Sequence, residues 1–188
     1  VLEGITPVPY ISITLGHEPA GVVAALGPDT EGPPVGAPVA VCPFIVCRRC
    51  LTCRLGREQV CLHRRCIGIQ AEGALAEYVK VPVDNLVPLP EGFPLEQGAI
   101  ITDAVATPFH ALTATGRLAA GETVAVFGCG GLGVHAVQLA RLAGASRVAA
   151  VDVRPAPLER ALALGADLAV DASRQDPVEA VREMTGGP

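Results

Sequence analysis

The stretch TVAVFGCGGLG, residues 123–133, decides the fold of this chain. Its first five residues are almost entirely apolar, as expected of a strand that is buried on both faces of a parallel sheet. Glycines follow at once, and residues 131–143 then have the pattern of a helix that Gly144 ends. A strand, a glycine turn and a helix in this order predict the start of an open α/β sheet.

The segments after this turn continue the alternation. A helix that opens at Pro155 tolerates its prolines because they lie in the first turn, and Gly165 follows it as a C-cap. Asp176-Pro177 is an N-cap and first-turn pair that opens a third helix. The sequence therefore predicts strands at 123–127, 147–151 and 167–170 and helices at 131–143, 155–164 and from 177.

The glycine turn has the composition of a dinucleotide-binding loop, in which the backbone approaches a pyrophosphate at a helix N-terminus. Asp152 ends the second strand, where its carboxylate is expected to accept hydrogen bonds from a ribose diol. That carboxylate repels a 2′-phosphate, so NAD is favoured over NADP, although Arg154 favours the opposite choice. The alternative is a tight turn that binds no ligand. The loop residues expected to contact the cofactor are Gly128, Gly130, Gly131, Leu132 and Gly133.

Residues 1–90 have the pattern of short strands separated by turns. Strand-like runs lie at 22–26, 37–41 and 76–81, next to turns rich in proline, glycine and aspartate. Short strands at this spacing predict a small β-barrel or sandwich. Between 95 and 118 apolar residues recur at three- and four-residue intervals, which predicts helix. The chain is therefore expected to be an α/β protein with a β-rich first domain.

The strongest chemical signal is the arrangement Cys47-x2-Cys50-x2-Cys53-x7-Cys61. Four thiolates suit a tetrahedral zinc ion, and a site whose four positions are all filled by protein is structural rather than catalytic. An iron–sulfur cluster is the main alternative, but it favours a shorter last gap that is followed by proline. Four unconnected core cysteines are the remaining alternative.

Charge is unevenly distributed along the chain. Residues 47–66 hold six Arg and one Glu, a net +5, whereas the whole chain carries −5, so the remainder sums to −10. Proteins that bind nucleic acid usually spread basic residues over a face, so this pattern argues against a nucleic-acid partner. A zinc-ribbon module that binds nucleic acid through the arginines is the alternative from a different functional class.

Composition excludes several classes of protein. An apolar content of 50% excludes a disordered chain, and the lack of an 18-residue apolar run predicts no membrane span. Seven cysteines, five of them between 47 and 66, without a secretion signal argue for metal binding in a reducing compartment, the cytoplasm. Cys42, Cys66 and Cys129 are expected to be buried small apolar side chains.

Gly16-His17-Glu18 and Thr102-Asp103 carry residue types that bind metals. A single histidine is more often a core or surface residue, and a single aspartate is more often a helix cap. The spacing between His17 and Asp103 does not bring them together by itself. From the residues alone, a shared metal site and two separate structural roles both stay open.

Several motifs occur along the chain in one order: LGHEPAGVV at 15–23, the cysteine lobe, GALAEYV at 73–79, TDAVATP at 102–108, the glycine turn and LGAD at 164–167. Over essentially all 188 residues, this order resembles a zinc-dependent alcohol dehydrogenase of the medium-chain dehydrogenase/reductase family. The resemblance implies a GroES-like catalytic domain over 1–104, with a structural-zinc lobe at about 42–66. The first half of an NAD-binding Rossmann domain, a doubly wound parallel sheet, then follows over 105–188.

The resemblance also implies site residues. His17 is expected to be a ligand of a catalytic zinc, Glu18 the neighbouring carboxylate that approaches this zinc, and Asp103 the third ligand. Thr107 matches a position that lines the nicotinamide pocket. The ligands of the structural zinc would be Cys47, Cys50, Cys53 and Cys61. The implied reaction is hydride transfer between a primary or secondary alcohol, or an aldehyde or ketone, and NAD, in a homo-oligomeric enzyme.

The family's first catalytic ligand is a cysteine that would lie upstream of Val1, and its second Rossmann half would lie beyond Pro188. We therefore expect a chain truncated at both ends, with a fully loaded cysteine site and weak loading of the His17/Asp103 site. A polyol dehydrogenase or a reductase of the same family, and a catalytically inactive fragment that binds only zinc and nucleotide, are the alternatives. Zinc-free reductases of the family generally lack the cysteine lobe and the Gly-His-Glu pattern.

Overall fold

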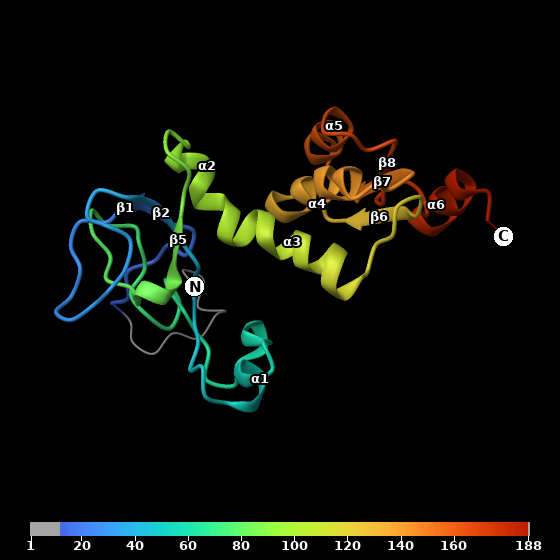
Figure 1. Cartoon of the computed structure of the whole chain (residues 1–188). Helices are drawn as coiled ribbons and strands as arrows, with labels where there is room; N and C mark the ends of the chain where they lie inside the picture. The colour runs from blue at the N-terminus through green and yellow to red at the C-terminus, as the bar shows by residue number, and fades with distance from the viewer. Residues whose placement is uncertain (1–11, 188) are drawn as a thin grey trace. The chain divides into compact units, whose positions relative to one another are not determined.

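The structure of the chain, a computed structural model, describes residues 12–187 (Figure 1). The chain divides into two compact units, one up to Asp103 and one from Ala104 onward, and each is described by itself. No helix in the described part of the chain is both long enough and apolar enough to cross a membrane.

The first unit is built on antiparallel strand pairs. Its larger sheet has the order β1-β2-β5, and a smaller sheet pairs β3 with β4. Residues 39–41 of the central strand β2 are at most 4% exposed and form the core of this sheet. Nδ2 of the buried Asn85 donates to the carbonyls of Cys42 (2.7 Å) and Phe44 (3.0 Å), which anchors the chain between β2 and β3. The elements are β1 (Ala20–Val22), β2 (Pro38–Val41), β3 (Phe44–Ile45), α1 (Leu51–Arg54), η1 (Glu58–Val60), β4 (Arg65–Cys66), η2 (Val83–Asn85), β5 (Leu86–Pro88) and α2 (Leu95–Ile100).

Two strand predictions in this unit are wrong. The run 22–26 is strand only at its start, since β1 ends at Val22 and residues 24–29 are exposed. The run 76–81 forms no strand, and none of the described strands pairs with it. Alternating side chains meet only one condition for a strand; the other is a partner backbone that accepts and donates the ladder hydrogen bonds. The run 37–41, which has such partners on both sides, is β2.

The second unit has the β-α-β-α-β order that the sequence predicts. Strands β6, β7 and β8 form a parallel sheet in that order, with Thr123 opposite Arg147 and Asp152 opposite Asp171. The elements are α3 (Ala106–His110), η4 (Ala111–Thr115), β6 (Thr123–Phe127), α4 (Gly131–Leu142), β7 (Arg147–Asp152), α5 (Pro155–Ala163), β8 (Leu168–Asp171) and α6 (Pro177–Thr185).

The burial of β6 differs from the sequence prediction. The sequence predicts that residues 123–127 are covered on both faces, but Thr123, Ala125 and Phe127 are exposed. The strand buried on both faces is β7, whose residues 148–152 are all buried because it has a neighbouring strand on each side. In the described residues β6 is paired with β7 alone, so its own coverage is partial.

The predicted helix ends follow their caps. Gly144 adopts φ +89° directly after the last turn of α4 and its C-cap Ala143, a backbone angle that glycine adopts without strain. At α6, Oδ1 of Asp176 accepts the backbone N–H of Val178 at 2.7 Å, which confirms the predicted N-cap. The helices bury their apolar faces in a core that includes Cys129, Val137, Ala140, Val148 and Ala161, all 0% exposed.

The helix predicted between 95 and 118 is confirmed, but part of it is widened. Residues Ile101–Val105 (η3) and η4 are π-helical turns on either side of α3. Pro108 has no N–H to donate to the carbonyl of Ala104 four residues earlier, and its ring crowds that carbonyl, so a regular α-helical turn is unfavourable here. Asp103 lies in η3, and π-helical turns are frequent at functional sites.

Candidate functional site

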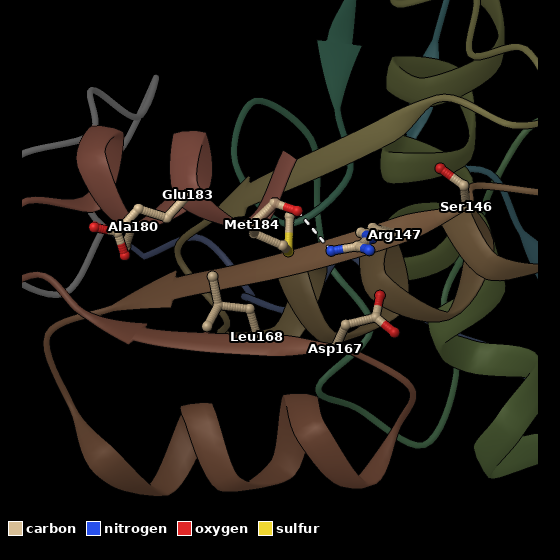
Figure 2. A pocket seen from close by; sticks show the side chains of 7 residues that line it. All are labelled: Ser146, Arg147, Asp167, Leu168, Ala180, Glu183 and Met184. Carbon is tan, nitrogen blue, oxygen red and sulfur yellow. Dashed lines mark hydrogen bonds between the residues drawn. The ribbon is translucent and has the colours of Figure 1, made fainter. Parts of the chain in front are cut away.

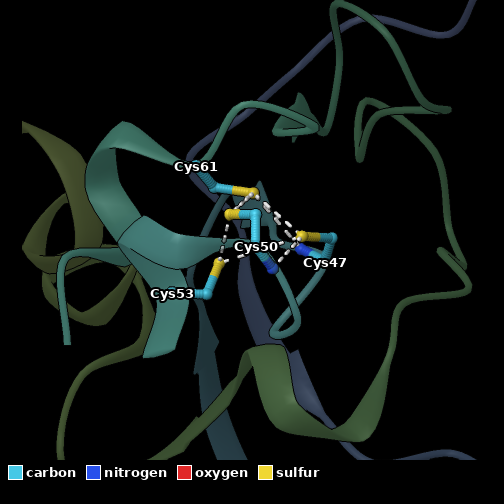
Figure 3. Close-up of side chains that lie close together, drawn as sticks. All are labelled: Cys47, Cys50, Cys53 and Cys61. Carbon is cyan, nitrogen blue, oxygen red and sulfur yellow. Dashed lines mark hydrogen bonds between the residues drawn. The ribbon is translucent and has the colours of Figure 1, made fainter. Parts of the chain in front are cut away.

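Four cysteine thiols gather in the first unit, and Figure 3 shows their sulfur atoms facing one another. The Sγ–Sγ separations are 3.4 Å for Cys50–Cys53, 3.6 Å for Cys47–Cys61, 3.9 Å for Cys50–Cys61 and 4.0 Å for Cys47–Cys53. A tetrahedral zinc ion with Zn–S bonds of about 2.3 Å needs edges of about 3.8 Å. All four thiols are free, so the group fits a closed zinc site of the structural type.

Hydrogen bonds prepare two of these thiols for ionisation. The Thr52 hydroxyl, 3.1 Å from the Sγ atom of Cys50, lowers the pKa of Cys50 to about 5, with help from backbone N–H groups. The backbone N–H of Cys47, 3.4 Å from the Sγ atom of Cys61, lowers the pKa of Cys61. Burial and the neighbouring thiols raise the pKa of Cys53 to about 12. A divalent ion that binds four thiolates must therefore displace a proton from Cys53.

The six arginines of residues 47–66 are exposed, and two of them have partners within the first unit. Nη1 of Arg48 lies 3.2 Å from Oδ2 of Asp84. The guanidinium of Arg64 lies 4.5 Å from the ring centre of Phe44 in β3. The Arg48 contact connects the cysteine lobe to η2 and the Arg64 contact lies within the lobe, although exposed ion pairs contribute little stability.

His17 and Asp103 meet in the first unit. The Nε2 atom of His17 lies 3.1 Å from Oδ2 of Asp103, and the two side chains are 44% and 22% exposed. A tetrahedral zinc ion with bonds of about 2.1 Å to nitrogen and oxygen needs an edge of about 3.4 Å, so the pair fits two of its positions. In the chain between residues 12 and 187, no third His, Cys, Asp or Glu brings a ligand atom within 4.8 Å of both. The pair offers two donors of an open site.

Thr102, the residue before Asp103, anchors the helical turn that carries Asp103. Oγ1 of Thr102 donates to the carbonyl of Val41 at 2.9 Å, which ties η3 to the end of β2. Cys66 is buried in the same region, and burial together with the negative charge of Asp103 raises the pKa of the Cys66 thiol. This cysteine is therefore a protonated, buried thiol near the carboxylate.

Two further predicted residues, Glu18 and Thr107, are not grouped with this pair as metal donors. Glu18 follows His17 and is half-buried, but its carboxylate does not come within 4.8 Å of both ligand atoms. Thr107 is exposed in α3 of the second unit, one residue before Pro108. The expected place of Thr107 beside a nicotinamide stays a prediction.

The glycine turn lies at the carboxyl end of β6. Gly128 has φ +85°, and a Cβ on Gly133 would overlap the carbonyl of Gly128, so the start of α4 approaches the turn only because glycine stands there. Above Gly130 and Gly131, by contrast, a Cβ would meet nothing within 4 Å. The first turn of α4 has no side-chain cap and no acidic residue, so no side chain of this turn occupies its N–H groups. This geometry fits the pyrophosphate of a dinucleotide.

Asp152 at the end of β7 is 7% exposed and is held by three backbone N–H groups. Its Oδ2 atom accepts from Cys129 at 2.9 Å, and Oδ1 accepts from Val153 at 2.8 Å and Arg154 at 3.0 Å. These hydrogen bonds, led by that of Cys129, lower the pKa of Asp152. The sequence predicts a ribose diol as the partner of this carboxylate; the structure adds that it ties the glycine turn to β7.

A cavity of about 540 Å³ lies elsewhere in the second unit (Figure 2). It opens at the amino ends of β7 and β8 against α6, where Nη1 of Arg147 donates to the carbonyl of Met184 at 2.6 Å. Ligands of open α/β sheets bind at the carboxyl ends of the strands, where the glycine turn lies. This cavity therefore lies at the opposite end of the strands from the glycine turn.

Sequence reasoning missed the hydroxyls that support these groups. Thr52 acts on a cysteine thiol and Thr102 anchors η3, and the signal that pointed to them was only their position beside a ligand residue. Cys66 and Cys129 are buried as expected, whereas Cys42 is half-buried.

Two protein-family descriptions match the chain: "Alcohol dehydrogenase GroES-like domain" over residues 1–91 and "Zinc-binding dehydrogenase" over residues 131–188. An L-threonine 3-dehydrogenase of Symbiobacterium thermophilum is 38% identical over 178 residues, which are 93% of this chain and 49% of that protein. The solved alcohol dehydrogenase TADH of Thermus sp. ATN1 superposes with a TM-score of 0.90 at 33% identity, over 97% of this chain and 54% of that one.

A zinc-binding dehydrogenase of Sinorhizobium meliloti, solved with NADP, has a TM-score of 0.84 and 38% identity over 89% of this chain and 48% of that one. The chain thus spans about half the length of the relatives that it matches. Its antiparallel first unit, its parallel second unit and its four-cysteine group agree with these similarities. The chain belongs to the zinc-containing medium-chain dehydrogenase/reductase family of alcohol and threonine dehydrogenases.

Proposed function

We propose that this chain carries the zinc and dinucleotide sites of a dehydrogenase that transfers hydride between an alcohol, or the matching aldehyde or ketone, and NAD. The observation that carries this proposal is the 3.1 Å contact between His17 and Asp103. A nitrogen donor and an oxygen donor from distant parts of the chain converge there, next to a half-buried Glu18.

The two metal sites have different tasks. Cys47, Cys50, Cys53 and Cys61 fill all positions of one ion and hold the lobe together, so no position is left for a substrate. His17 and Asp103 would hold only two positions of a zinc ion, which would leave room for further ligands and a substrate oxygen. A zinc ion bound by this pair supplies Lewis-acid polarisation of an alcohol or carbonyl oxygen.

The second unit supplies the dinucleotide site. The N–H groups at the start of α4 bind the pyrophosphate, and the open space above Gly130 and Gly131 admits it. Asp152 has one hydrogen bond on Oδ2, which leaves a lone pair of this atom for a ribose hydroxyl. Its negative charge supports NAD over NADP, and the exposed Arg154, with its Nε atom 3.6 Å from Oδ1 of Asp152, is already oriented toward that carboxylate.

The substrate is a small alcohol. L-Threonine, whose secondary hydroxyl group is oxidised by the enzyme that the relative's name describes, is the second candidate, because threonine dehydrogenases are prominent among the relatives at 35–39% identity. A polyol is the third candidate, since galactitol-1-phosphate dehydrogenase of Escherichia coli superposes with a TM-score of 0.87 at 30% identity.

The test is NADH formation by the zinc-loaded chain with primary alcohols, secondary alcohols, a polyol and L-threonine. We expect turnover that Asp103→Asn abolishes and that Glu96→Gln, an exposed change on α2, leaves unchanged. NADH fluorescence titration is run beside it. NADH binding without turnover on any substrate would show that the chain is a nucleotide- and zinc-binding fragment.

A further inference from the structure

The backbone that leads into His17 is held by a second segment, residues 68–75, which we call the strap. The strap N–H groups of Gly73 and Leu75 donate to the carbonyls of Thr14 (2.8 Å) and Leu15 (2.9 Å). Ala74 donates to the carbonyl of Gly16 at 3.1 Å. The three consecutive carbonyls directly before His17 therefore accept hydrogen bonds from three consecutive strap residues.

The two segments also lie unusually close together. A Cβ on Gly73 would overlap the carbonyl of Leu15, and a Cβ on Gly68 would lie 2.6 Å from the carbonyl oxygen of Gly16. A Cβ on Gly16 would itself lie 2.9 Å from the Cγ atom of Leu75. Contacts below 3 Å are far inside ordinary van der Waals separation, so glycines on both sides are what allows this approach.

The strap is anchored to the core of the first unit. Ile67, one residue before it, is 1% exposed, and its N–H donates to the carbonyl of Pro43 at 2.9 Å. Within the strap, Gly68 donates to Ala71 at 2.8 Å, and at its far side a carboxylate oxygen of Glu72 accepts the N–H of Thr14 at 2.8 Å. A segment that is anchored in this way can hold the residues that it contacts in a fixed position.

We propose that the strap is the positioning element of His17, and that Gly73 is a positioning residue for the metal site that His17 and Asp103 form. The Thr102 hydroxyl, next to Asp103, donates to the carbonyl of Val41 and ties η3 to the end of β2. The strap thus fixes one donor and η3 fixes the other, which sets their 3.1 Å separation. This inference rests on the proposed function for one point alone, namely that the site binds a metal. The placement of His17 is a property of the metal-free chain.

Gly73 is the position that tests this idea most cleanly. Its φ lies outside the left-handed region that Gly16 and Gly68 occupy, so alanine is compatible with its backbone and only the added methyl group acts. To admit that methyl group, Leu15 and Gly16 must move by roughly 1 Å. Gly21→Ala in β1 is the matched control, since a Cβ there meets nothing within 4 Å.

The first readout is the imidazole NMR signal of His17 in the 188-residue chain with zinc only at the cysteine site. It is assigned with His17→Gln, and Asp103→Asn gives the position of the signal when the contact is lost. We expect Gly73→Ala to move the signal to that position and Gly21→Ala to leave it in place. An unmoved signal in Gly73→Ala overturns the proposal.

The second readout is calorimetric titration of the same one-zinc proteins with further zinc. Gly73→Ala should weaken binding at the second site by about 10- to 100-fold, as losses of supporting contacts around metal ligands do, while the cysteine site keeps its zinc. If the parent chain binds no second zinc, the proposed function fails, and the NMR comparison still decides the role of the strap.

Glu72→Ala removes the side-chain bond to Thr14 without adding bulk, so it serves if Gly73→Ala does not fold. A shifted His17 signal with an intact cysteine site then supports the proposal. An unshifted signal in this variant overturns it.

Discussion

The Nε2 atom of His17 and the Oδ2 atom of Asp103 lie 3.1 Å apart, although 86 residues separate them in the chain. The strap presents one of these donors and the π-helical turn η3 presents the other. Because their separation is already close to the edge of a zinc tetrahedron, binding an ion replaces one contact and needs little rearrangement. The four cysteine thiols also lie close to the edges of a zinc tetrahedron before an ion binds, but together they supply all four donors.

This difference predicts the zinc content of the chain. After extensive dialysis we expect about one zinc ion per chain, held by four thiolates, because the open pair offers only two donors. Elemental analysis measures the ratio, and Cys61→Ser should remove the retained zinc. Two tightly held ions per chain would contradict the assignment of an open second site.

The Thr52 hydroxyl should set the pH dependence of the cysteine site. Thr52→Val removes the main interaction that lowers the pKa of Cys50, so a proton then competes with zinc at higher pH than in the parent chain. Competition with a coloured chelator should show weaker zinc binding at about pH 6.5 and a smaller difference at about pH 9.

Thr30→Val is the matched control, since the Thr30 hydroxyl donates to the carbonyl of Pro28 and not to a cysteine of the described chain. An equal loss for Thr52→Val at both pH values would mean that the hydroxyl acts through packing alone.

Two glycines of the turn should respond in different ways to alanine. Gly131→Ala places a methyl group in open space, so the thermal stability stays and NADH binding weakens because the pyrophosphate loses its close approach. Gly133→Ala drives a methyl group into the Gly128 carbonyl, so both stability and binding fall. Thermal unfolding and NADH fluorescence separate the two effects. Unchanged NADH affinity in Gly131→Ala would place the dinucleotide elsewhere.

Asp152 should stabilise the second unit even without a nucleotide. Asp152→Asn leaves at least one buried N–H without an acceptor, at a cost of about 1–3 kcal/mol in the free energy of unfolding at neutral pH. The folded-state pKa of Asp152 is lowered, so its stabilisation is present above the ordinary pKa of 3.8 and is lost as pH falls through the lowered value.

Denaturant titrations at several pH values should therefore show the gap between parent and Asp152→Asn closing in acid. Glu159→Gln, an exposed change on α5, should show no gap at any pH. A gap that persists below the lowered pKa of Asp152 would show that shape, and not charge, is what the substitution removes.

The second unit was predictable because its elements are local. Alternation of apolar strands and helices, the caps at Asp176 and Gly144, and the glycine turn all lie within a few residues of the structure that they cause. The burial of β6 was not predictable, since it depends on which strands lie beside it. The strand predicted at 76–81 is wrong for the same reason. Alternation of apolar and polar residues predicts which face of a strand is buried, but it does not supply a neighbouring strand to pair with.

The candidate site divides along the same line. Cysteine spacing predicted the closed group, because its four residues lie close together in sequence and carry one chemistry. His17 and Asp103 were joined only by resemblance, since no local pattern connects residues so far apart. Gly73 is the first residue of the motif GALAEYV, yet its role depends on the close approach of Leu15, which only the folded chain reveals.

The most direct measurement is anomalous diffraction at the zinc edge from crystals of the chain grown with excess zinc. We predict one peak among the four cysteine sulfurs and a second within about 2.0–2.2 Å of both Nε2 of His17 and Oδ2 of Asp103. A saturated crystal whose only other zinc lies away from these two atoms would contradict the dehydrogenase site.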